Sequence, residues 1–303
     1  MEEQLQFSPG HSQQWMPTSI RATIDPISFF PLVIFLAFLY LSYITYKDYR
    51  AFLSLGRGGV PWNFYGYLLV TAVRPFTLRS PLLYPNVPTS LAGKGHLSEF
   101  SIPTRRGIRP VVQGIIPQRQ ITQQGSPINF ALTHAALSAL SEKYPSKCIA
   151  AGSQVEQHSK GLHSLIDRTG NHSPRGICKE SEVCHVHVFD GSVHVELHPE
   201  DVKVVIDKGW GERHPLALGW QSAFLPEGFT LLYAPRTAEE VEVLMRIVGA
   251  GMGWATGGEK GWVDRAGECA REVCKIGQKE AVLVEEMVEQ WGDMEKERLK
   301  IIM

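Results

Sequence analysis

The apolar pattern is most extreme near the start of the chain, where residues 26–46 contain no charged side chain. A helix needs about 20 such residues to cross the hydrocarbon core of a bilayer, and this run is long enough. Asp25 and Lys47 bound the run, and tyrosines gather at its C-terminal end, as aromatic residues do at membrane interfaces. The pattern predicts a single transmembrane helix, whose apolar residues begin at Ile27 and end at Tyr46.

Two alternatives are a cleaved signal peptide and a buried core helix. The long, partly acidic stretch before the run, the length of the run and the lack of a small-residue cleavage site argue against a signal peptide. The uncharged length argues against a core helix. Lys47, Arg50 and Arg57 follow the run, whereas only Arg21 closely precedes it. The positive-inside rule then places the C-terminal part in the cytosol, with the endoplasmic reticulum as one candidate membrane.

The regions next to the predicted anchor differ in composition. Residues 1–25 are polar, rich in Gln and Ser, and typical of a disordered tail. Residues 47–146 combine juxtamembrane helices with a Pro-, Gly- and Arg-rich extended segment at 74–128. The apolar run from Phe64 to Val73 is too short to span a membrane but suits a membrane surface. Apolar residues at helical spacing predict a helix over 128–144.

Residues 147–258 carry the pattern of an α+β domain. Two alternating runs, 184–189 and 193–197, flank an Asp-Gly turn and predict a β-hairpin. A short helix is predicted to start at Pro199. A further strand is predicted over 229–233, where apolar residues dominate.

A second helix of this region starts at Thr237, which forms a capping box with Glu240, and runs to about Val248. Three alternate glycines that follow are predicted to break it. The order strand, strand, helix, strand, helix is typical of an α+β fold with one antiparallel sheet and packed helices. Residues 259–303 accumulate Glu and Lys beside an apolar stripe, which predicts a charged, solvent-exposed terminal helix.

Composition excludes one class of partner. The formal net charge of −1 over 303 residues offers no basic field, so nucleic acid is not an expected partner. The five cysteines lack a metal-binding Cys-x-x-Cys pair and are interpreted as free thiols in a reducing compartment. Disulfides formed in a lumen are the alternative.

The predicted hairpin carries the first candidate chemistry. Because side chains alternate along a strand, His185 and His187 share one face of the first strand. On the return strand His194, Glu196 and His198 share a face, and valines take the opposite one. If both valine faces point into the core, up to four imidazoles and a carboxylate gather on the other side. Such a cluster can bind a transition metal or supply general acids and bases.

Established catalytic and metal-binding motifs do not resolve this choice. The hairpin spacing does not match the His-x-His…Glu arrangement of cupin metal sites, because the glutamate lies too far along. The sequence contains no His-Glu-x-x-His motif, no nucleophile elbow, no phosphate-binding loop and no dinucleotide fingerprint. We therefore favour a half-exposed sheet face with polar histidines, and predict no metal ligand.

The stretch 208–216 concentrates unusual side chains in one loop. Trp210 offers a flat stacking surface, and Glu212, Arg213 and His214 offer an acid, a fixed cation and a group that titrates near neutrality. This mixture is typical of a loop shaped around a ligand. A well-ordered connection whose polar groups satisfy one another is the alternative.

A weaker pattern lies upstream of the hairpin. Ser153, Glu156, His158 and Lys160 carry polar groups at near-alternate positions. This spacing predicts another strand edge of the same pocket.

Blocks that run through most of the chain carry a family resemblance. In the N-terminal half they are Asp48-Tyr49-Arg50-Ala51-Phe52-Leu53 with Gly56, and Asn63-Phe64 with Gly66-Tyr67. In the C-terminal half they are Ser153, Glu156, His158 and Lys160, His185-x-His187 with His194, Lys208-Gly209-Trp210-Gly211 with Arg213-His214-Pro215-Leu216-Ala217, and Leu232-Tyr233-Ala234-Pro235-Arg236 with Glu239-Glu240. These blocks, in this order, resemble the fungal luciferase family and its luciferase-like domain. The first 25 residues and those after about 258 lie outside the resemblance.

The resemblance implies a membrane-anchored enzyme that acts on a planar polyketide or phenolic substrate. It implies that molecular oxygen is added to a hydroxylated pyrone, 3-hydroxyhispidin, with release of carbon dioxide, light and a ring-opened acid. Oxygen is then a co-substrate, and no flavin, ATP or other cofactor is expected. Such a reaction needs a base, donors or a cation for the developing anion, and a dry pocket.

We assign these roles as hypotheses. His185, His187 or His214 is the candidate base, and Arg213 is the candidate anion clamp. The candidate substrate-binding residues are Trp210 as a stacking wall, Glu212, His194, Glu156, His158 and Tyr233. This reading predicts that Arg213, His214 and the hairpin histidines converge on one buried pocket.

Two other functions stay open. The first is a non-catalytic, membrane-tethered ligand-binding or scaffold protein that keeps the fold, in which these side chains are scattered or solvated. The second is a metal-dependent enzyme, in which the ring nitrogens of three of the four hairpin histidines lie close enough to share an ion.

Overall fold

The computed structural model describes residues 26–153, 155–156, 159–166, 182–219 and 225–277. The chain separates into two compact units, Met1–Lys47 and Asp48–Met303. The predicted disordered tail, and residues 278–303 of the predicted terminal helix, lie outside the described residues.

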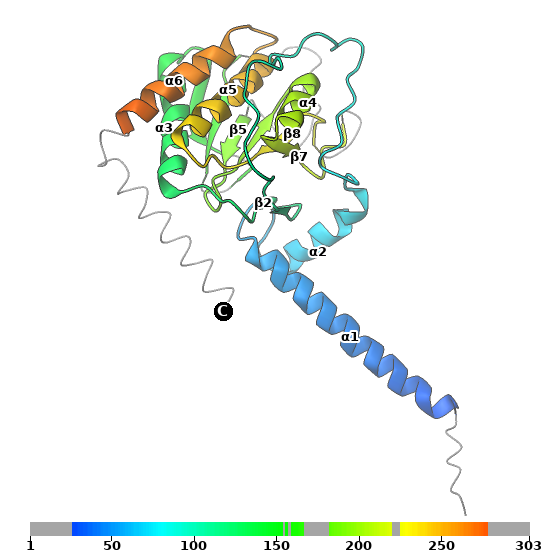
Figure 1. Cartoon of the computed structure of the whole chain (residues 1–303). Helices are drawn as coiled ribbons and strands as arrows, with labels where there is room; N and C mark the ends of the chain where they lie inside the picture. The colour runs from blue at the N-terminus through cyan, green and yellow to red at the C-terminus, as the bar shows by residue number, and fades with distance from the viewer. Residues whose placement is uncertain (1–25, 154, 157–158, 167–181, 220–224, 278–303) are drawn as a thin grey trace, which may run out of the picture. The chain divides into compact units, whose positions relative to one another are not determined.

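Helix α1 spans Pro26–Ser54 and continues past the apolar run, which ends at Tyr46 (Figure 1). From Phe30 onward most of its apolar side chains are exposed. Among the described residues, Phe30–Ser54 is the one segment long and apolar enough to cross a membrane, and none of its most apolar window is buried. A buried core helix therefore does not fit. A signal sequence passes the same test of length and composition, so the membrane span stays a prediction.

The end of α1 and helix α2 (Phe64–Val73) form a small apolar cluster within the second unit. Phe52, Tyr67 and Val70 are buried in it, and the Tyr67 hydroxyl donates to the Asp48 carboxylate at 3.0 Å. Other apolar side chains of α2 are exposed: Phe64, Tyr65, Leu68 and Leu69. An exposed apolar surface of this kind is expected of a helix that lies at a membrane surface.

Residues 74–126 contain little regular structure, as predicted. They include a 3-10 turn, η1 (Arg74–Phe76), and a two-stranded hairpin of β1 (Val112–Gln113) and β2 (Arg119–Gln120). Hydrogen bonds between residues distant in the sequence tie this segment to the rest of the unit: Tyr84 with Asp207, Arg105 with Lys208, and Gln120 with Asp190. The extended segment thereby brings β2 against the turn of the predicted hairpin.

One six-stranded sheet forms the centre of the second unit, in the order β3-β4-β5-β6-β8-β7. Its strands are β3 (Cys148–Gly152), β4 (Lys160–Ser164), β5 (Glu182–Val186), β6 (Val193–Glu196), β7 (Gly211–Arg213) and β8 (Phe229–Leu232). Every neighbouring pair is antiparallel, which confirms the predicted α+β fold. Strands β3 and β4 lie in a stretch whose small and polar residues give no clear alternation, and the sequence does not predict them.

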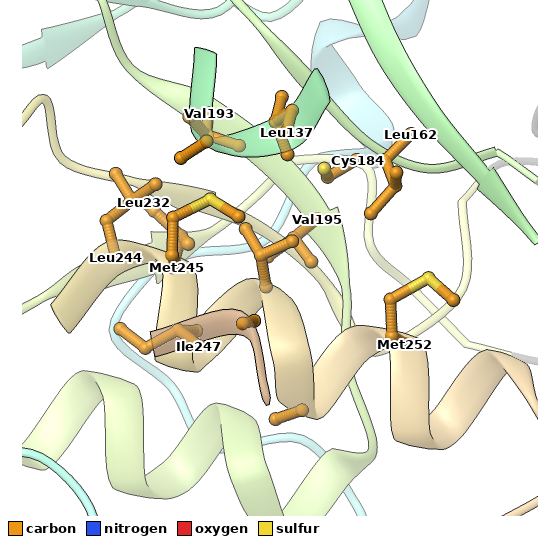
Figure 2. Packing of buried hydrophobic residues seen from close by; sticks show 14 of the residues in the cluster. Leu137, Leu162, Cys184, Val193, Val195, Leu232, Leu244, Met245, Ile247 and Met252 are labelled. Atoms are coloured by element: carbon orange, nitrogen blue, oxygen red, sulfur yellow. The ribbon is translucent and has the colours of Figure 1, made fainter. Parts of the chain in front are cut away.

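Four helices accompany the sheet: α3 (Pro127–Lys143), α4 (Pro199–Asp207), α5 (Ala238–Ala255) and α6 (Trp262–Gly277) (Figure 1). Side chains from α3 and α5 meet those of the sheet in the main core, as Leu137, Val195 and Met245 illustrate (Figure 2). Trp262 and Ala270 of α6 are also fully buried. The core therefore includes helices on both sides of the range 147–258, and α6 is a packed helix with one exposed face.

The glycines of α5 correct one prediction, because the helix continues through them to Ala255. A Cβ on Gly249 would lie 2.3 Å from the carbonyl oxygen of Trp262, and one on Gly251 would lie 3.0 Å from that of Glu196. These glycines let α5 approach α6 and the sheet more closely than any side chain would allow. The cost of a helical glycine, roughly 1 kcal/mol relative to alanine, is offset by that packing.

Candidate functional site

The two faces of the hairpin formed by β5 and β6 have different surroundings. Val193 and Val195 point into the core, as predicted (Figure 2). His185, His187 and His194 lie on the opposite face and are 2%, 0% and 5% exposed. The predicted half-exposed sheet face is therefore wrong. Segments far away in the sequence cover the histidines, and the alternation of residues along a strand does not reveal which segments these are.

The covered face encloses a cavity of about 150 Å³, a volume that accommodates about one aromatic ring. His185, His187, His194 and His214 line it. The remaining wall is mostly apolar. Its apolar part is formed by Gly58, Gly59, Ile115, Ile116, Pro117, Val155, Leu216, Leu225 and Phe229, and its polar part by Gln118, Arg119 and Glu156. A second hollow of about 460 Å³ shares Gly58, Gly59 and Val155 with the cavity and continues to Arg57 and Trp62.

Three imidazoles converge at one end of this cavity. The Nδ1 atom of His194 lies 3.1 Å from Nε2 of His187 and 3.3 Å from Nε2 of His185. One ring nitrogen from each of the three lies within 4.8 Å of the other two. The structure thus brings together three of the four hairpin histidines.

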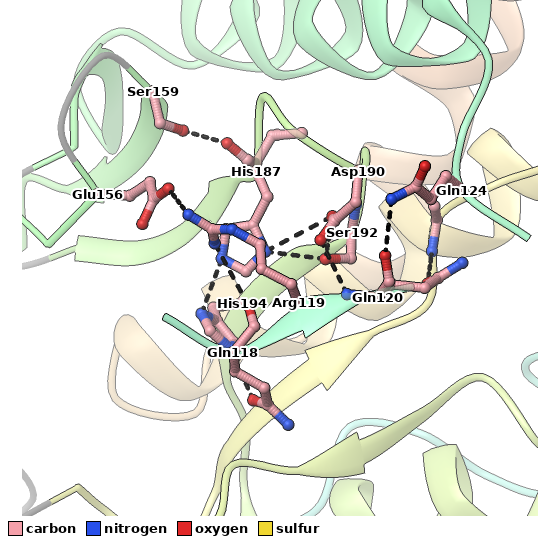
Figure 3. A network of polar contacts seen from close by, with 12 residues as sticks. Gln118, Arg119, Gln120, Gln124, Glu156, Ser159, His187, Asp190, Ser192 and His194 are labelled. Carbon is pink, nitrogen blue, oxygen red and sulfur yellow. Dashed lines mark hydrogen bonds and ion pairs between the residues drawn. The ribbon is translucent and has the colours of Figure 1, made fainter. Parts of the chain in front are cut away.

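The outer nitrogens of these rings bind neighbouring polar groups, and Figure 3 shows those of His187 and His194. His187 Nδ1 contacts Ser192 Oγ at 2.8 Å, and that hydroxyl donates to Asp190 at 2.6 Å. His194 Nε2 contacts Gln118 Oε1 at 3.0 Å. The third ring, His185, contacts a carboxylate oxygen of Glu182 through Nδ1 at 2.7 Å. Each ring therefore has a fixed orientation.

Burial controls the charge of the cavity histidines. It lowers the pKa of His187 and His194 well below the usual value, and the neighbouring imidazoles and Arg119 disfavour a further positive charge on either ring. It also lowers the pKa of His214 to about 3. These imidazoles are neutral near pH 7. His214 Nδ1 accepts a hydrogen bond from the Leu216 N–H at 3.0 Å, so this lone pair is not free to act as a base.

A buried ion pair forms part of the cavity wall. The Arg119 guanidinium donates to the Glu156 carboxylate, and Nη2 of Arg119 also donates to the Arg57 carbonyl at 2.7 Å. The Arg119 Nε atom has no hydrogen-bond partner among the described residues. Burial raises the pKa of Glu156, although Arg119 opposes this shift. A guanidinium with a spare donor provides positive charge for an anionic ligand.

Glu156 lines the cavity, as predicted, but not from the edge of a strand. Strand β3 ends at Gly152 and β4 begins at Lys160, so Ser153 and Glu156 lie outside both strands and do not form the predicted strand edge. The Glu156 N–H donates to Ser153 Oγ at 2.9 Å. His158, the other candidate of residues 153–159, lies outside the described residues.

Arg213 lies outside the cavity wall and does not clamp an anion there. Its guanidinium donates to the carbonyls of Leu83, Ala217 and Glu227, at 3.2, 2.5 and 3.3 Å. These bonds hold together segments that are distant in the sequence. Arg213 lies on strand β7, so the predicted loop is wrong at this position, although its polar group is satisfied within the fold as the alternative expected.

The other loop candidates are also set back from the cavity. Trp210 is buried in the main core, where its indole N–H donates to the Pro103 carbonyl at 2.6 Å, so it forms no stacking wall. Glu212 accepts from the Tyr233 hydroxyl at 3.0 Å and faces the Gln118 amide at 3.5 Å. Glu212 and Tyr233 therefore stand behind Gln118, which in turn contacts His194.

His198, the fourth hairpin histidine, leaves the cluster because the strand has ended. Its Nδ1 atom accepts from the Glu200 N–H at 3.2 Å and caps α4. Its ring lies 4.8 Å from that of Trp254. An N-cap role is typical of a polar residue directly before a helix-starting proline, so the sequence contained this signal.

Sequence reasoning missed Gln118, Arg119, Asp190 and Ser192 as site residues. Gln118 and Arg119 lie in a segment without periodicity, and only tertiary contacts bring them to the histidines. The hairpin pattern predicts Asp190 as a turn residue only. Its carboxylate also accepts from the Ser192 and Gln120 N–H groups, each at 2.8 Å, so the turn orients His187 as well.

Comparisons with known proteins bear on the same residues. The family model of the luciferase domain matches residues 180–251. The luciferase of Neonothopanus nambi is 32% identical over 226 residues, covering 70% of this chain and 82% of that protein. The luciferase of Armillaria gallica is 31% identical over 229 residues, covering 72% of this chain and 84% of that protein. The chain belongs to the fungal luciferase family. No solved structure matches it.

The luciferase-domain match and the cavity overlap. The matched range contains β5, β6, α4, β7, β8 and part of α5. It therefore includes all four histidines of the cavity wall, whereas Arg119 and Glu156 precede it. The family assignment thus applies to the hairpin that carries the imidazole cluster.

Proposed function

We propose that this fungal luciferase relative is a membrane-anchored oxygenase of hydroxylated pyrones of the 3-hydroxyhispidin type. One observation carries the proposal: neutral, buried imidazoles from the domain that defines the family, and a buried guanidinium from β2, line one largely apolar cavity. The products are a ring-opened acid and carbon dioxide, which together contain all the atoms of the pyrone and of one oxygen molecule.

The first step is removal of the proton from the ring hydroxyl, because an electron-rich anion reacts with oxygen more readily than a neutral phenol. A base suited to this step has a lone pair directed at the substrate and is uncharged at neutral pH. His185 and His187 have Nε2 atoms that face the cluster and Nδ1 atoms bonded elsewhere. The cluster supplies the proton acceptor, and His214 serves as a fixed wall.

The second requirement is stabilisation of the anion and of the peroxide that follows. Arg119 takes the role that the sequence suggested for Arg213, since it lines the cavity and has an unpaired Nε donor. Leu216, Leu225 and Phe229 exclude water from the same space, which also limits quenching of an excited product. Phe229 replaces Trp210 as the aromatic wall.

The third element of the proposal is membrane attachment through α1. The uncharged run within this helix and the exposed apolar side chains of α2 support it. The positive charges after the run favour a cytosolic position for the second unit. Planar polyphenols partition into bilayers, so an anchored enzyme meets its substrate at a raised local concentration.

The test is to incubate detergent-solubilised, full-length protein with 3-hydroxyhispidin and with simpler hydroxypyrones. Oxygen uptake and photon emission are recorded together. Uptake with light supports a luciferase, and uptake without light supports an oxygenase that does not emit. If folded protein gives neither signal with any pyrone, the oxygenase proposal fails and a ligand-binding role takes its place. Tight pyrone binding without turnover would identify that role.

A further inference from the structure

We propose that His185, His187 and His194 bind one divalent first-row transition-metal ion at the end of the cavity. Neutral imidazoles are ligands for zinc, cobalt, iron and copper, and three protein ligands with an open fourth position form a catalytic type of site. The existence of this site is independent of the oxygenase reaction. Only its use in catalysis rests on the proposed function.

Two of the three separations between the inner nitrogens match a shared ion, and the third is within 4.8 Å. With nitrogen–metal distances of ~2.0–2.1 Å, two ligand nitrogens lie about 2.9–3.4 Å apart for angles between 90° and tetrahedral. His194 Nδ1 lies 3.1 Å from His187 Nε2 and 3.3 Å from His185 Nε2. A small adjustment of the rings admits an ion between them.

The positions of the ring protons strengthen this inference, beginning with His187. The Ser192 hydroxyl has one proton, and that proton is directed to Asp190 at 2.6 Å. Ser192 Oγ must therefore accept the proton on His187 Nδ1, at 2.8 Å. The Nε2 atom of His187 is left with a lone pair that faces the cluster.

The same reasoning applies to His185. Its Nδ1 atom lies 2.7 Å from Glu182 Oε1, which also accepts from the Ser153 hydroxyl at 2.8 Å. Ser153 Oγ is itself the acceptor for the Val155 and Glu156 N–H groups, so its own proton goes to Glu182. Because Glu182 Oε1 accepts the Ser153 proton, it also accepts the proton on His185 Nδ1. His185 Nε2 is therefore the ring nitrogen that faces the cluster.

The third ring is oriented by an amide. Gln118 directs its NH₂ group towards Glu212 Oε1 at 3.5 Å, so its carbonyl oxygen faces His194 Nε2 at 3.0 Å. His194 is then protonated on Nε2, and its Nδ1 atom carries the inward lone pair. The inward lone pairs of His187 Nε2 and His194 Nδ1, 3.1 Å apart, repel each other, and a cation between them removes that repulsion. Bonds from the far nitrogen to a carboxylate, hydroxyl or amide are the usual support of metal-ligating imidazoles.

The formal charges around the cluster favour a divalent ion. Glu182, Asp190 and Glu156 are buried carboxylates, and Arg119 is the guanidinium paired with one of them. Acidic side chains therefore outnumber the guanidinium around the cluster, which favours a divalent cation among the imidazoles. The competing occupant is a single proton on His194 Nδ1, shared with the two neighbouring rings, which supplies only half that charge.

The remaining coordination positions face the apolar cavity, because all three histidines line it. His214 does not complete the set, since its Nδ1 atom accepts from the Leu216 N–H at 3.0 Å. A ligand oxygen, such as the hydroxyl of the proposed pyrone, is the group that can reach an ion there. The positive charge of the ion would then favour ionisation of that hydroxyl. This role replaces the one proposed above for an imidazole lone pair as proton acceptor.

The test measures metal binding and not light. Full-length protein is purified in detergent without a polyhistidine tag, and its metal content is measured by inductively coupled plasma mass spectrometry. The protein is then stripped with dipicolinate and titrated with Co²⁺, whose visible absorption reports nitrogen coordination. The variants H185Q, H187Q and H194Q preserve side-chain size. H134Q is the matched control, because His134 packs against Phe130 on α3, away from the cavity.

We expect about one equivalent of Co²⁺ per chain for the wild-type protein and for H134Q. Each cluster variant should bind at least about 100-fold more weakly, and Q118A, which keeps all three ligands, about 10-fold more weakly. Near-ultraviolet circular dichroism checks folding. The proposal is overturned if stripped wild-type protein binds Co²⁺ no more tightly than H187Q or H194Q, or if folded wild-type protein binds none. If wild-type protein binds Co²⁺ but turns over no pyrone in the oxygen-uptake assay, the metal site stands and only the proposed function is rejected.

Discussion

His185 and His194 pair directly across β5 and β6, and their rings meet at 80°, with His185 Nε2 3.3 Å from His194 Nδ1. The register of a two-stranded hairpin therefore sets this contact. A slip of one residue would turn the imidazoles into the core and the valines into the cavity. The turn that contains Asp190 fixes the register and also supports His187 through Ser192. Fold and candidate chemistry depend on the same short segment.

The first prediction concerns the imidazole cluster. H194Q should reduce oxygen uptake with an active pyrone by at least about 100-fold, because it removes either a proton acceptor or a metal ligand. The wild-type ring is neutral, so this substitution removes no charge. The measurement is steady-state oxygen consumption, with H134Q assayed in parallel. Unchanged uptake by folded H194Q would remove the cluster from the reaction.

The second prediction concerns the buried pair of Arg119 and Glu156. R119Q leaves a buried carboxylate without its cation, which should lower the free energy of unfolding by about 3–5 kcal/mol. The double variant R119Q/E156Q should regain much of that stability, because neither charge remains. Its oxygen uptake should stay low if Arg119 stabilises an anion. Chemical denaturation and oxygen uptake on the single and double variants separate the two effects.

Full activity in R119Q/E156Q would assign the pair a purely structural role. R213Q is a useful comparison, because Arg213 binds backbone carbonyls outside the cavity. That variant should lose stability, with little loss of uptake in the fraction that remains folded.

Sequence patterns predicted the parts of the fold in which periodicity is strong. The alternation around His185 and His194 identified the hairpin, and the apolar stripe of α4 identified its buried residues. The glycines of α5 misled the prediction, since a local rule treats glycine as a helix breaker. Here close approach to α6 and the sheet outweighs the local preference.

The candidate site was only partly predictable, for a related reason. His185, His187, His194, His214 and Glu156 were named from the sequence, and all of them line the cavity. Arg119 was missed and Arg213 was misplaced, because a lone arginine in an irregular segment carries no pattern. Which arginine reaches the histidines depends on long-range contacts, such as the bond from Gln120 to Asp190, that no local spacing encodes.

The third prediction tests the packing of α5. G251A should destabilise the protein by about 1–3 kcal/mol, even though alanine favours helices, because its methyl group would overpack the core. That methyl would lie 2.8 Å from Val195 Cγ2 and 3.0 Å from the Glu196 carbonyl oxygen. G152A is the control, since nothing lies within 4 Å of a Cβ at Gly152. Urea denaturation should show a lower midpoint for G251A only; equal midpoints would refute the packing argument.

The fourth prediction concerns stability as a function of pH and rests on Asp201. This carboxylate accepts from the His96 and Leu97 N–H groups at 2.8 and 2.7 Å through one oxygen, and its other oxygen has no hydrogen-bond partner among the described residues. Burial raises its pKa from 3.8 to about 7. The folded state therefore retains a proton that the unfolded state releases, and stability falls as the pH rises between these two values.

D201N removes this titration while keeping an oxygen for the two N–H groups. The melting temperature of D201N, taken relative to that of wild type, should therefore be higher at pH 8 than at pH 5. The underlying difference in stability is about 1.4 kcal/mol for each unit by which the pKa is shifted within that range. The amide leaves an unpaired donor that lowers stability equally at both pH values, so the difference between them is the informative quantity. Thermal melts at the two pH values provide it. A D201N effect of the same size at both would mean that the buried carboxyl titrates normally.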